Sequence, residues 1–148
     1  MISQTGQYAL RACVYLAQEA GDAACSGARI AGRTGIPAKY LSKILGDLVH
    51  AGVLDATRGK GGGFRLRRPP ADLRLLEILS PFESSLRDDS ACPFRHGECS
   101  SRSPCPGHDR WRIVKDGFRS FVQDMTLAAV ATSSAPAKTA PQRKGKRT

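Results

Sequence analysis

Apolar residues recur at helical spacing through the first part of the chain. Over residues 3–20 they fall one, three or four positions apart, at Tyr8, Ala9, Ala12, Cys13, Leu16 and Ala17. This is the spacing of one face of an α-helix. We therefore predict a helix that begins at the capping residue Ser3 and ends at Gly21.

Two further helices are predicted before residue 52. The first follows Ser26 and ends at residues 34–35. The second starts near Pro37, ends at Gly52, and has apolar residues at i, i+3, i+4, i+7 and i+8, namely Leu41, Ile44, Leu45, Leu48 and Val49. Its opposite face is small or cationic. Two helices joined by a glycine-containing turn, the second basic outside, are typical of a helix-turn-helix.

The pattern changes to a β-hairpin after residue 52. Residues 53–54 and 64–66 are short strand candidates, joined by a turn that contains Gly59, Gly61, Gly62 and Gly63. A helix-turn-helix followed directly by a cationic hairpin is the order of a winged helix. One more short helix is expected within residues 72–82, ending before Pro81.

Beyond this unit, the chain divides into three further segments. Residues 83–108 are polar and show no helical period, so a loop of this length is expected to have a function or to lack order. Apolar residues then return three and four apart, at Trp111, Val114, Phe118, Phe121, Met125 and Ala128, with Ile113, Val122 and Leu127 widening the stripe. This predicts one long amphipathic helix that packs on the domain and on a symmetry mate. The last residues are low-complexity and basic.

The expected fold class is thus mainly α with a small β-hairpin wing. The predicted segments are a winged helix-turn-helix DNA-binding domain over 1–82, a cysteine-rich sensor loop over 83–108, a dimerisation helix over 109–132, and a disordered basic tail over 133–148.

Charge adds a partner to this picture. The 148 residues have a formal net charge of +10, and residues 1–137 are basic even without the cationic tail. An excess of positive charge favours a polyanionic binding partner, first nucleic acid and second an anionic membrane. No apolar run approaches the roughly 20 residues that span a bilayer, and the first residues lack the features of a signal peptide. We expect a cytoplasmic protein without membrane contacts.

The second helix of the helix-turn-helix and the wing supply the candidate DNA contacts. The first turns of the helix would face the major groove, through Pro37, Ala38, Lys39, Tyr40, Ser42 and Lys43. At the wing, Arg58 and Lys60 would reach phosphates or a minor groove, and Gly61 and Gly62 would allow close backbone approach. For Tyr40, packing on the core is an equal alternative.

The stretch CPFRHGECSSRSPCPGH holds a candidate metal site. Cys92, Cys99 and Cys105 are separated by six and five residues, and His108 follows after two more. Thiolates suit an iron–sulfur cluster or zinc, and a reducing compartment disfavours a structural disulfide. Three thiolates and an imidazole would satisfy zinc, although structural zinc ligands usually come in close pairs. His96, Glu98 and Asp109 are interpreted as solvated residues, and Cys13 as a core thiol.

The stretches YALRACVYLA, IAGRTGIPAKYLSKILGDLVHAGVL and RGKGGGFRL, followed by the cysteine loop, resemble the IscR/NsrR (Rrf) family of bacterial winged-helix repressors over residues 1–132. The resemblance implies a homodimer that reads a pseudo-palindromic operator in double-stranded DNA. It also implies a 2Fe–2S or 4Fe–4S cluster held by the three cysteines. In similar members two residues separate the last cysteine from a histidine ligand, and a tryptophan follows. Cys105, His108 and Trp111 match that arrangement, whereas the first gap is six residues where many members have five.

The resulting expectation is a homodimeric DNA-binding repressor that senses iron–sulfur, nitric oxide or redox status through a cluster. The alternative is the same regulator with a zinc-bound or thiol-redox loop. A remote alternative is an enzyme that uses cysteine and histidine, but no oxyanion or cofactor motif supports it.

Overall fold

The computed structural model describes residues 2–88, 92–94 and 99–132. Its main elements follow the chain as α1 (Gln4–Tyr15), α2 (Gly27–Thr34), α3 (Ala38–His50), β1 (Leu54–Thr57), β2 (Gly63–Leu66), α4 (Leu75–Leu79), α5 (Ser84–Arg87), α6 (His108–Asp124) and α7 (Leu127–Ala131). Helices dominate, and the two strands form an antiparallel hairpin. The expected fold class, mainly α with a small β-hairpin wing, is therefore confirmed.

The first three helices begin and end as the sequence predicts. The hydroxyl of Ser3 accepts a hydrogen bond from the Gly6 N–H at the start of α1, and Ser26 caps α2 in the same way. After Tyr15 the first helix continues as a π-helical turn, Leu16–Ala20. The buried residues of α1, α2 and α3 form one core with those of α4. The helix-turn-helix is thus held by apolar packing rather than by polar contacts.

The wing is fixed to the helical body by a third backbone segment. In the hairpin, Leu54 pairs with Leu66 and Thr57 with Gly63. Cys25 and Phe64 exchange two backbone hydrogen bonds of 2.8 Å, so the residue before α2 adds a bridge beside β2. A Cβ atom on Gly63 would lie 2.4 Å from the Cys25 oxygen, and its φ is 146°. Glycine is therefore required where the wing meets the body.

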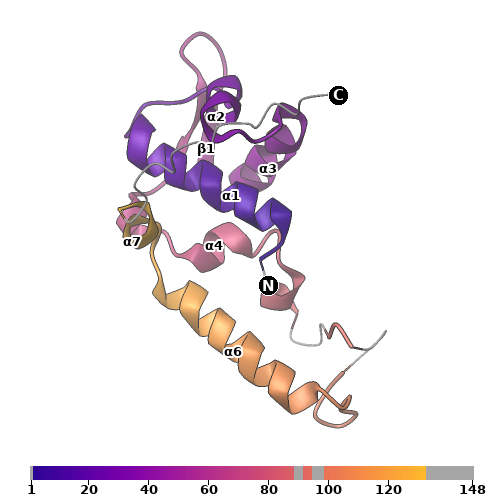
Figure 1. Cartoon of the computed structure of the whole chain (residues 1–148). Coiled ribbons are helices and arrows are strands. Elements are labelled where there is room, and N and C mark those ends of the chain that lie inside the picture. The colour runs from indigo at the N-terminus through magenta and orange to yellow at the C-terminus, as the bar shows by residue number, and fades with distance from the viewer. Residues whose placement is uncertain (1, 89–91, 95–98, 133–148) are drawn as a thin grey trace, which may run out of the picture.

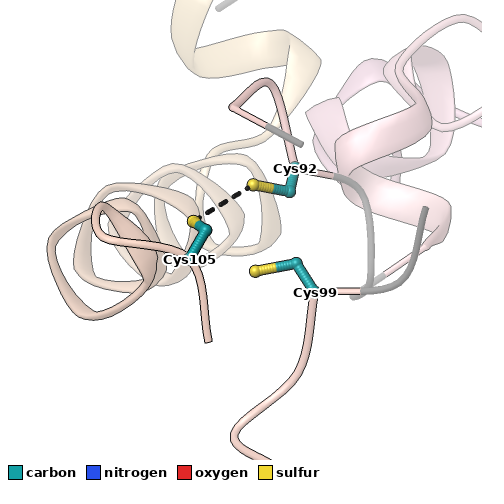
Figure 2. Close-up of side chains that lie close together, drawn as sticks. All are labelled: Cys92, Cys99 and Cys105. Atoms are coloured by element: carbon teal, nitrogen blue, oxygen red, sulfur yellow. Dashed lines mark hydrogen bonds between the residues drawn. The ribbon is translucent and has the colours of Figure 1, made fainter. Parts of the chain in front are cut away.

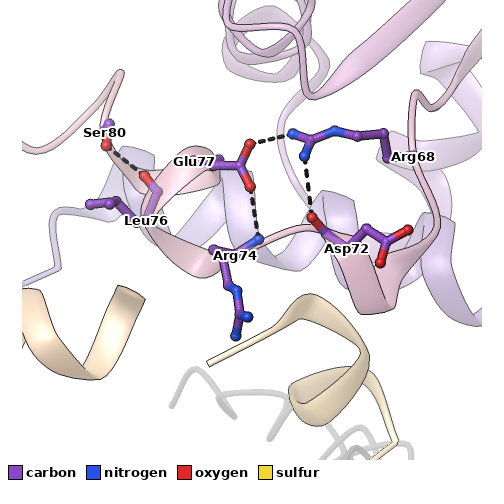
Figure 3. Close-up of polar contacts among 6 residues, drawn as sticks. All are labelled: Arg68, Asp72, Arg74, Leu76, Glu77 and Ser80. Carbon is purple, nitrogen blue, oxygen red and sulfur yellow. Dashed lines mark hydrogen bonds and ion pairs between the residues drawn. The ribbon is translucent and has the colours of Figure 1, made fainter. Parts of the chain in front are cut away.

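A polar network covers the join between the wing and α4 (Figure 3). The carboxylate of Glu77 accepts a 3.0 Å hydrogen bond from the Arg74 N–H and pairs with the guanidinium of Arg68. Arg68 also donates to the carbonyl of Asp72. Although partial burial acts in the opposite direction, these contacts lower the pKa of Glu77 below its usual value.

The predicted long C-terminal helix is interrupted, which corrects the sequence-based expectation over residues 109–132. Helix α6 ends at Asp124, Met125 is extended, and Thr126 caps the separate helix α7. The reason is a tertiary backbone pairing. The Leu75 N–H donates to the Met125 carbonyl, and the Leu127 N–H donates to the Leu73 carbonyl. These hydrogen bonds compensate for the helical ones that are missing at the break.

Helix α6 extends away from the winged-helix body and carries the cysteine loop at its far end (Figure 1). At its near end, Arg74 donates a 2.8 Å hydrogen bond to the Asp124 carbonyl. The buried Phe118 and Val122 pack on the core. The position of α6 is therefore fixed at the body, while the loop lies beyond most of the core.

The predicted loop over residues 83–108 contains one helical turn, α5, which its sequence period did not indicate. Just before it, the buried carboxylate of Glu83 accepts two 2.8 Å hydrogen bonds, from the N–H and the hydroxyl of Ser3. A Cβ atom on Gly6 would lie 2.3 Å from this carboxylate. The start of the loop is thus attached to the start of α1. Within the described ranges, no helix combines the length and apolar character that crossing a membrane requires.

Candidate functional site

The outer face of α3 presents the residues that the sequence predicts as DNA contacts. Its inner face is buried through Leu41, Ile44, Leu45 and Leu48. The six predicted contact residues on the opposite side are all exposed, namely Pro37, Ala38, Lys39, Tyr40, Ser42 and Lys43. Tyr40 is 62% exposed, so it lies on the outer face and not in the core.

Residues of α1 border the same face, which the sequence reasoning missed. Gln4, Thr5 and Tyr8 line a groove together with Lys39, Tyr40 and Lys43. The amide of Gln4 donates to the hydroxyl of Tyr8. Their polar side chains in the first turns of a helix were the one indication present in the sequence. These residues reach the outer surface of α3 only because α1 packs beside α3.

The wing divides its cations into two groups. The arginines on and after β2 have acidic partners, because Arg65 and Arg67 pair with Asp55. Arg58 and Lys60, at the exposed tip, form no ion pair within the described part of the chain. Of the two candidate glycines, Gly61 is exposed and Gly62 half-buried. The tip therefore offers unneutralised positive charge, as a phosphate-binding surface requires.

The three loop cysteines come together immediately before α6. Their sulfur atoms all lie within 4.8 Å of one another (Figure 2). The Cys92 and Cys105 sulfurs are 3.6 Å apart, and Cys99 and Cys105 are buried. Thiols separated by six and five residues thus form one compact group, as expected of ligands that share a metal centre.

His108, the first residue of α6, lies beside this group. Its Nδ1 atom is 3.2 Å from the Cys99 sulfur. Its Nε2 atom is buried and has no hydrogen-bond partner among the described residues. A buried imidazole nitrogen without a partner is uncommon, and metal coordination is one way to satisfy it. The fourth predicted ligand is therefore close to the thiols and contacts that of Cys99.

The surroundings of the cysteines are polar, cationic and aromatic. A cavity of about 410 Å³ is lined by Cys92, Cys99 and His108 together with Trp111, the cations Arg112, Lys115 and Arg119, the acid Asp116, and two serines. Phe94 packs edge-on against Trp111, with 6.1 Å between ring centroids. These cations and Phe94 were not predicted as site residues. Only the helical period of α6, at i, i+3 and i+7, could have indicated that Arg112, Lys115 and Arg119 share one face.

The loop thiols differ from the thiol in the core. Burial, followed by the hydrogen bond with the Cys92 thiol, raises the pKa of Cys105 above its usual value. Burial alone raises the pKa of Cys13 to about 12, which fits its predicted role as a small apolar core residue. Cys25 is buried beside the Tyr15 hydroxyl. Three thiols are grouped as candidate ligands, and the other two are separate core residues.

The donor set fits a metal or an iron–sulfur cluster. Three soft sulfur atoms converge, and beside them lies an imidazole whose buried Nε2 atom has no hydrogen-bond partner among the described residues. Asp109 is exposed, as predicted. The predictions for His96, Glu98 and the tail over 133–148 concern positions outside the described residues.

Comparisons with known proteins give the same fold and a family. IscR of Vibrio atlanticus is 29% identical over 126 residues, which cover 85% of this chain and 72% of that protein. The structure of T. potens IscR matches with a TM-score of 0.70 and 26% identity, covering 95% of this chain and 93% of the other. That of CymR, the global cysteine regulator of B. subtilis, matches with a TM-score of 0.72 at 23% identity, covering 91% and 98%. At that identity, CymR supports the fold alone.

The family model described as Rrf2, an iron-dependent transcriptional regulator, matches residues 2–133. This range contains the helix-turn-helix, the wing, the cysteine group and both C-terminal helices. The resemblance inferred from the sequence is confirmed, and these relatives are regulators of transcription rather than enzymes. The chain belongs to the Rrf2 family of transcriptional regulators.

Proposed function

We propose that the protein is a homodimeric DNA-binding repressor whose cysteine loop holds an iron–sulfur cluster and senses iron–sulfur, nitric oxide or redox status. The observation that carries the proposal is the group of three sulfur atoms within 4.8 Å at the start of α6. The other end of this helix is hydrogen-bonded to the winged-helix body through Arg74. In this proposal α6 connects the sensor loop to the DNA-binding body.

On the DNA side, the exposed face of α3 would enter the major groove. Lys39 and Lys43 lie on this face without an ion pair in the described residues, and Tyr40 is exposed between them. At the wing, Arg58 and Lys60 would bind phosphates or the minor groove. Two such units on a two-fold axis would require a pseudo-palindromic operator.

The proposed dimer surface is the exposed apolar face of α6. Ile113 is 71% exposed, Val114 42% and Phe121 48%. Gly117 lies four residues from both Ile113 and Phe121, and a Cβ atom there would meet open space. A small residue between large apolar ones lets a second helix approach closely. A second copy of α6 is the occupant that this self-complementary face favours.

Cys92, Cys99 and Cys105 would hold the cluster, with His108 as the fourth ligand. When bound, a cluster supplies an oxidant-sensitive group whose loss changes the charge and the order of the loop. The cations Arg112, Lys115 and Arg119 line the same cavity and would offset the negative charge of the thiolates.

The chain offers two routes from the loop to the DNA-binding surface. The guanidinium of Arg119 on α6 donates to the Leu86 carbonyl at the start of the loop, at 3.2 Å. Glu83 is bonded to Ser3, the N-cap of α1. A change in loop order would therefore act on α6 and α1 together. The bound cluster would favour one of two arrangements of the DNA-binding units, because it would bind that arrangement more tightly than the other.

One observation favours a second candidate, the same regulator with a zinc-bound loop. In a tetrahedral site with Zn–S bonds of about 2.3 Å, neighbouring sulfur atoms lie about 3.8 Å apart. The separation of 3.6 Å between Cys92 and Cys105 is close to this value. A histidine separated from the last cysteine by two residues, as His108 is from Cys105, also suits zinc.

The cofactor test starts from protein purified without oxygen. We expect visible charge-transfer absorption, iron and acid-labile sulfide, all abolished in Cys92→Ser, Cys99→Ser and Cys105→Ser. The matched control is Cys13→Ser, which changes a thiol in the core and should retain the cofactor. Colourless protein with stoichiometric zinc would refute the cluster and support the second candidate, the regulator with a zinc-bound loop.

The DNA test measures binding of the chain to its own promoter region at several salt concentrations. Lys43→Ala and Arg58→Ala should each weaken binding, and the slope of log affinity against log salt should fall by about 1 for each cation that no longer neutralises a phosphate. Arg87→Ala removes the same charge from the exposed surface of α5 and should leave binding unchanged. Intact binding in the Lys43→Ala, Arg58→Ala double variant would refute the winged-helix assignment.

The dimer test uses light scattering after size exclusion. Ile113→Asp with Phe121→Asp places two charges on the exposed apolar face and should yield monomers, since burying unpaired charge is costly. Gln123→Asp adds a charge to another exposed position of α6 and should leave the dimer intact. A dimer that survives the double change would place the interface elsewhere.

A further inference from the structure

The three loop cysteines are not equivalent. The side chains of Cys92 and Cys105 point toward each other, with their sulfur atoms 3.6 Å apart (Figure 2). The Cys99 sulfur lies 3.2 Å from the Nδ1 atom of His108 and also contacts the Cys105 thiol. Cys92 and Cys105 therefore form a thiol–thiol pair, and Cys99 is the thiol that lies beside the imidazole.

Access to solvent separates the members of the thiol–thiol pair. Cys92 is half-buried and lines the 410 Å³ cavity, so a small oxidant can reach its sulfur. Cys105 is only 8% exposed and is not among the residues that line this cavity. Cys99 also lines the cavity but is only 6% exposed, so Cys92 is the thiol that an oxidant in the cavity would meet first, with the Cys105 sulfur 3.6 Å from it.

The chain around the pair can make the small approach that a covalent bond requires. A disulfide has sulfur atoms about 2.0 Å apart and strict dihedral preferences. Cys92 and Cys105 lie outside helices and strands, and neither belongs to the continuous apolar core. Their closure would not require repacking of the winged-helix body.

We propose that, when the loop holds no metal, a hydroperoxide oxidises Cys92 and Cys105 to an intramolecular disulfide, while Cys99 stays reduced beside His108. The proposal rests on the proposed function only in that it describes the metal-free form of the same loop. It assigns distinct roles to the three thiols.

The chemistry takes two displacement steps. The Cys92 sulfur attacks the terminal peroxide oxygen, the O–O bond breaks, and an alcohol leaves, or water from hydrogen peroxide; Cys92 becomes a sulfenic acid. The Cys105 sulfur then attacks the Cys92 sulfur, the S–O bond breaks, and water leaves with the Cys105 proton. Overall, two thiols lose two electrons and two protons, which the hydroperoxide accepts.

The consequence is a reversible block on metal binding. The disulfide removes two of the three thiolate ligands, and Cys99 with His108 alone is an incomplete site. The loop would accept a metal again only after a thiol reductant cleaves the bond.

Trypsin can map the disulfide directly. The arginines at 87, 95, 102 and 110 allow cleavage that leaves each loop cysteine on its own peptide, 88–95, 96–102 or 103–110. Reduced, metal-free full-length protein would be treated with hydrogen peroxide, alkylated and digested. We expect peptide 88–95 linked to 103–110, with 96–102 alkylated. A dominant linkage through Cys99, or one between two chains, would overturn the proposal.

Variants separate the two steps. Cys105→Ser should stop at a sulfenic acid on Cys92, trapped as a dimedone adduct. Cys99→Ser is the matched control and should form the same linkage as the unaltered chain. A dimedone adduct chiefly on Cys99 in the Cys105→Ser protein would contradict the assigned order.

Cobalt(II) reports the block on metal binding without reducing the disulfide. The reduced protein should show thiolate-to-cobalt absorption, and the peroxide-treated protein should lose it until a thiol reductant restores it. Full absorption in completely cross-linked protein would overturn the block. If the linkage maps as expected but the reduced protein binds neither cobalt nor iron, the proposed function fails and the disulfide stands.

Discussion

Cys13 and Cys105 are both almost fully buried, at 0% and 8% exposure, but they lie in regions of opposite construction. Cys13 is on α1, inside a core formed by every helix of the winged-helix body. Cys105 lies outside that core, beside the thiols of Cys92 and Cys99 in an irregular part of the chain. The same side chain is a packing element in one region and a candidate ligand in the other.

This difference indicates which region of the molecule a bound ligand could reorder. The body buries enough apolar surface to define its own structure. The three loop cysteines lie outside the apolar core, and under the proposed function the order of the loop would depend on the group that their sulfur atoms hold. A sensor needs such a region, because a ligand shifts only an equilibrium that lies near balance. Free energies of unfolding should therefore respond differently to substitutions in the two regions.

The largest effect is expected where the two regions join. Glu83→Ala leaves the Ser3 N–H and hydroxyl without their buried acceptor, and should lower the free energy of unfolding by about 2 kcal/mol. Glu83→Gln keeps an acceptor oxygen and is the matched control, with a smaller loss. Urea denaturation measures both. Equal losses would show that charge, and not hydrogen bonding, holds the join.

Next in size is Cys13→Ser, which places a hydroxyl in the apolar core. The substitution should lower the free energy of unfolding by about 1.5 kcal/mol, because a polar group there is desolvated. Burial raises the pKa of the folded Cys13 thiol to about 12, whereas the thiol of the unfolded chain ionises at its ordinary, lower pKa. The parent therefore loses stability as the pH rises above the unfolded pKa and the serine variant does not, so the loss should be constant near neutrality and smaller at pH 9. Denaturation at both pH values checks this, and a loss that grows toward pH 9 would contradict it.

A smaller effect, which depends on pH, is expected for Glu77→Gln on the surface of the body. It removes the ion pair with Arg68 and should cost about 0.5 kcal/mol at neutral pH, since the pair is partly exposed. The folded pKa of Glu77 is lowered, so its contribution is complete above the unfolded value and is lost as the pH falls through the folded pKa. The difference between variant and parent should vanish in acid.

The smallest effect is expected for Cys105→Ser in reduced, metal-free protein. Although Cys105 is buried, it lies outside the apolar core and beside the Cys92 and Cys99 thiols, so the free energy of unfolding should not change measurably. The same substitution at Cys13 is the internal comparison. A loss at Cys105 as large as that at Cys13 would show that the loop has a core of its own, and would remove the contrast between the two regions.

Most of the winged-helix body could be predicted because its signals are local. Ser3 and Ser26 cap their helices as predicted, and the apolar spacing from Leu41 to Leu48 identifies the buried face of α3. The break after Asp124 could not be predicted, because the apolar period runs through it. It results from hydrogen bonds with Leu73 and Leu75, about fifty residues away in the chain.

The candidate site divides in the same way. Spacing and residue type alone indicate Cys92, Cys99, Cys105 and His108, since thiols and imidazole are distinctive ligands. The neighbouring cations and Phe94 have ordinary side chains, which become site residues only when the loop folds back on α6.

The sequence by itself determined the order of helices and wing, the exposed basic face of α3 and the identity of the ligand candidates. These follow from periodicity, caps and side-chain chemistry, which act within a few residues. Only the tertiary structure decided that α6 ends at Asp124, that Glu83 binds Ser3, and that Cys92 lies beside Cys105 and Cys99 beside His108. Each of these depends on the approach of segments distant in sequence or on the path of an irregular loop, which no local period encodes.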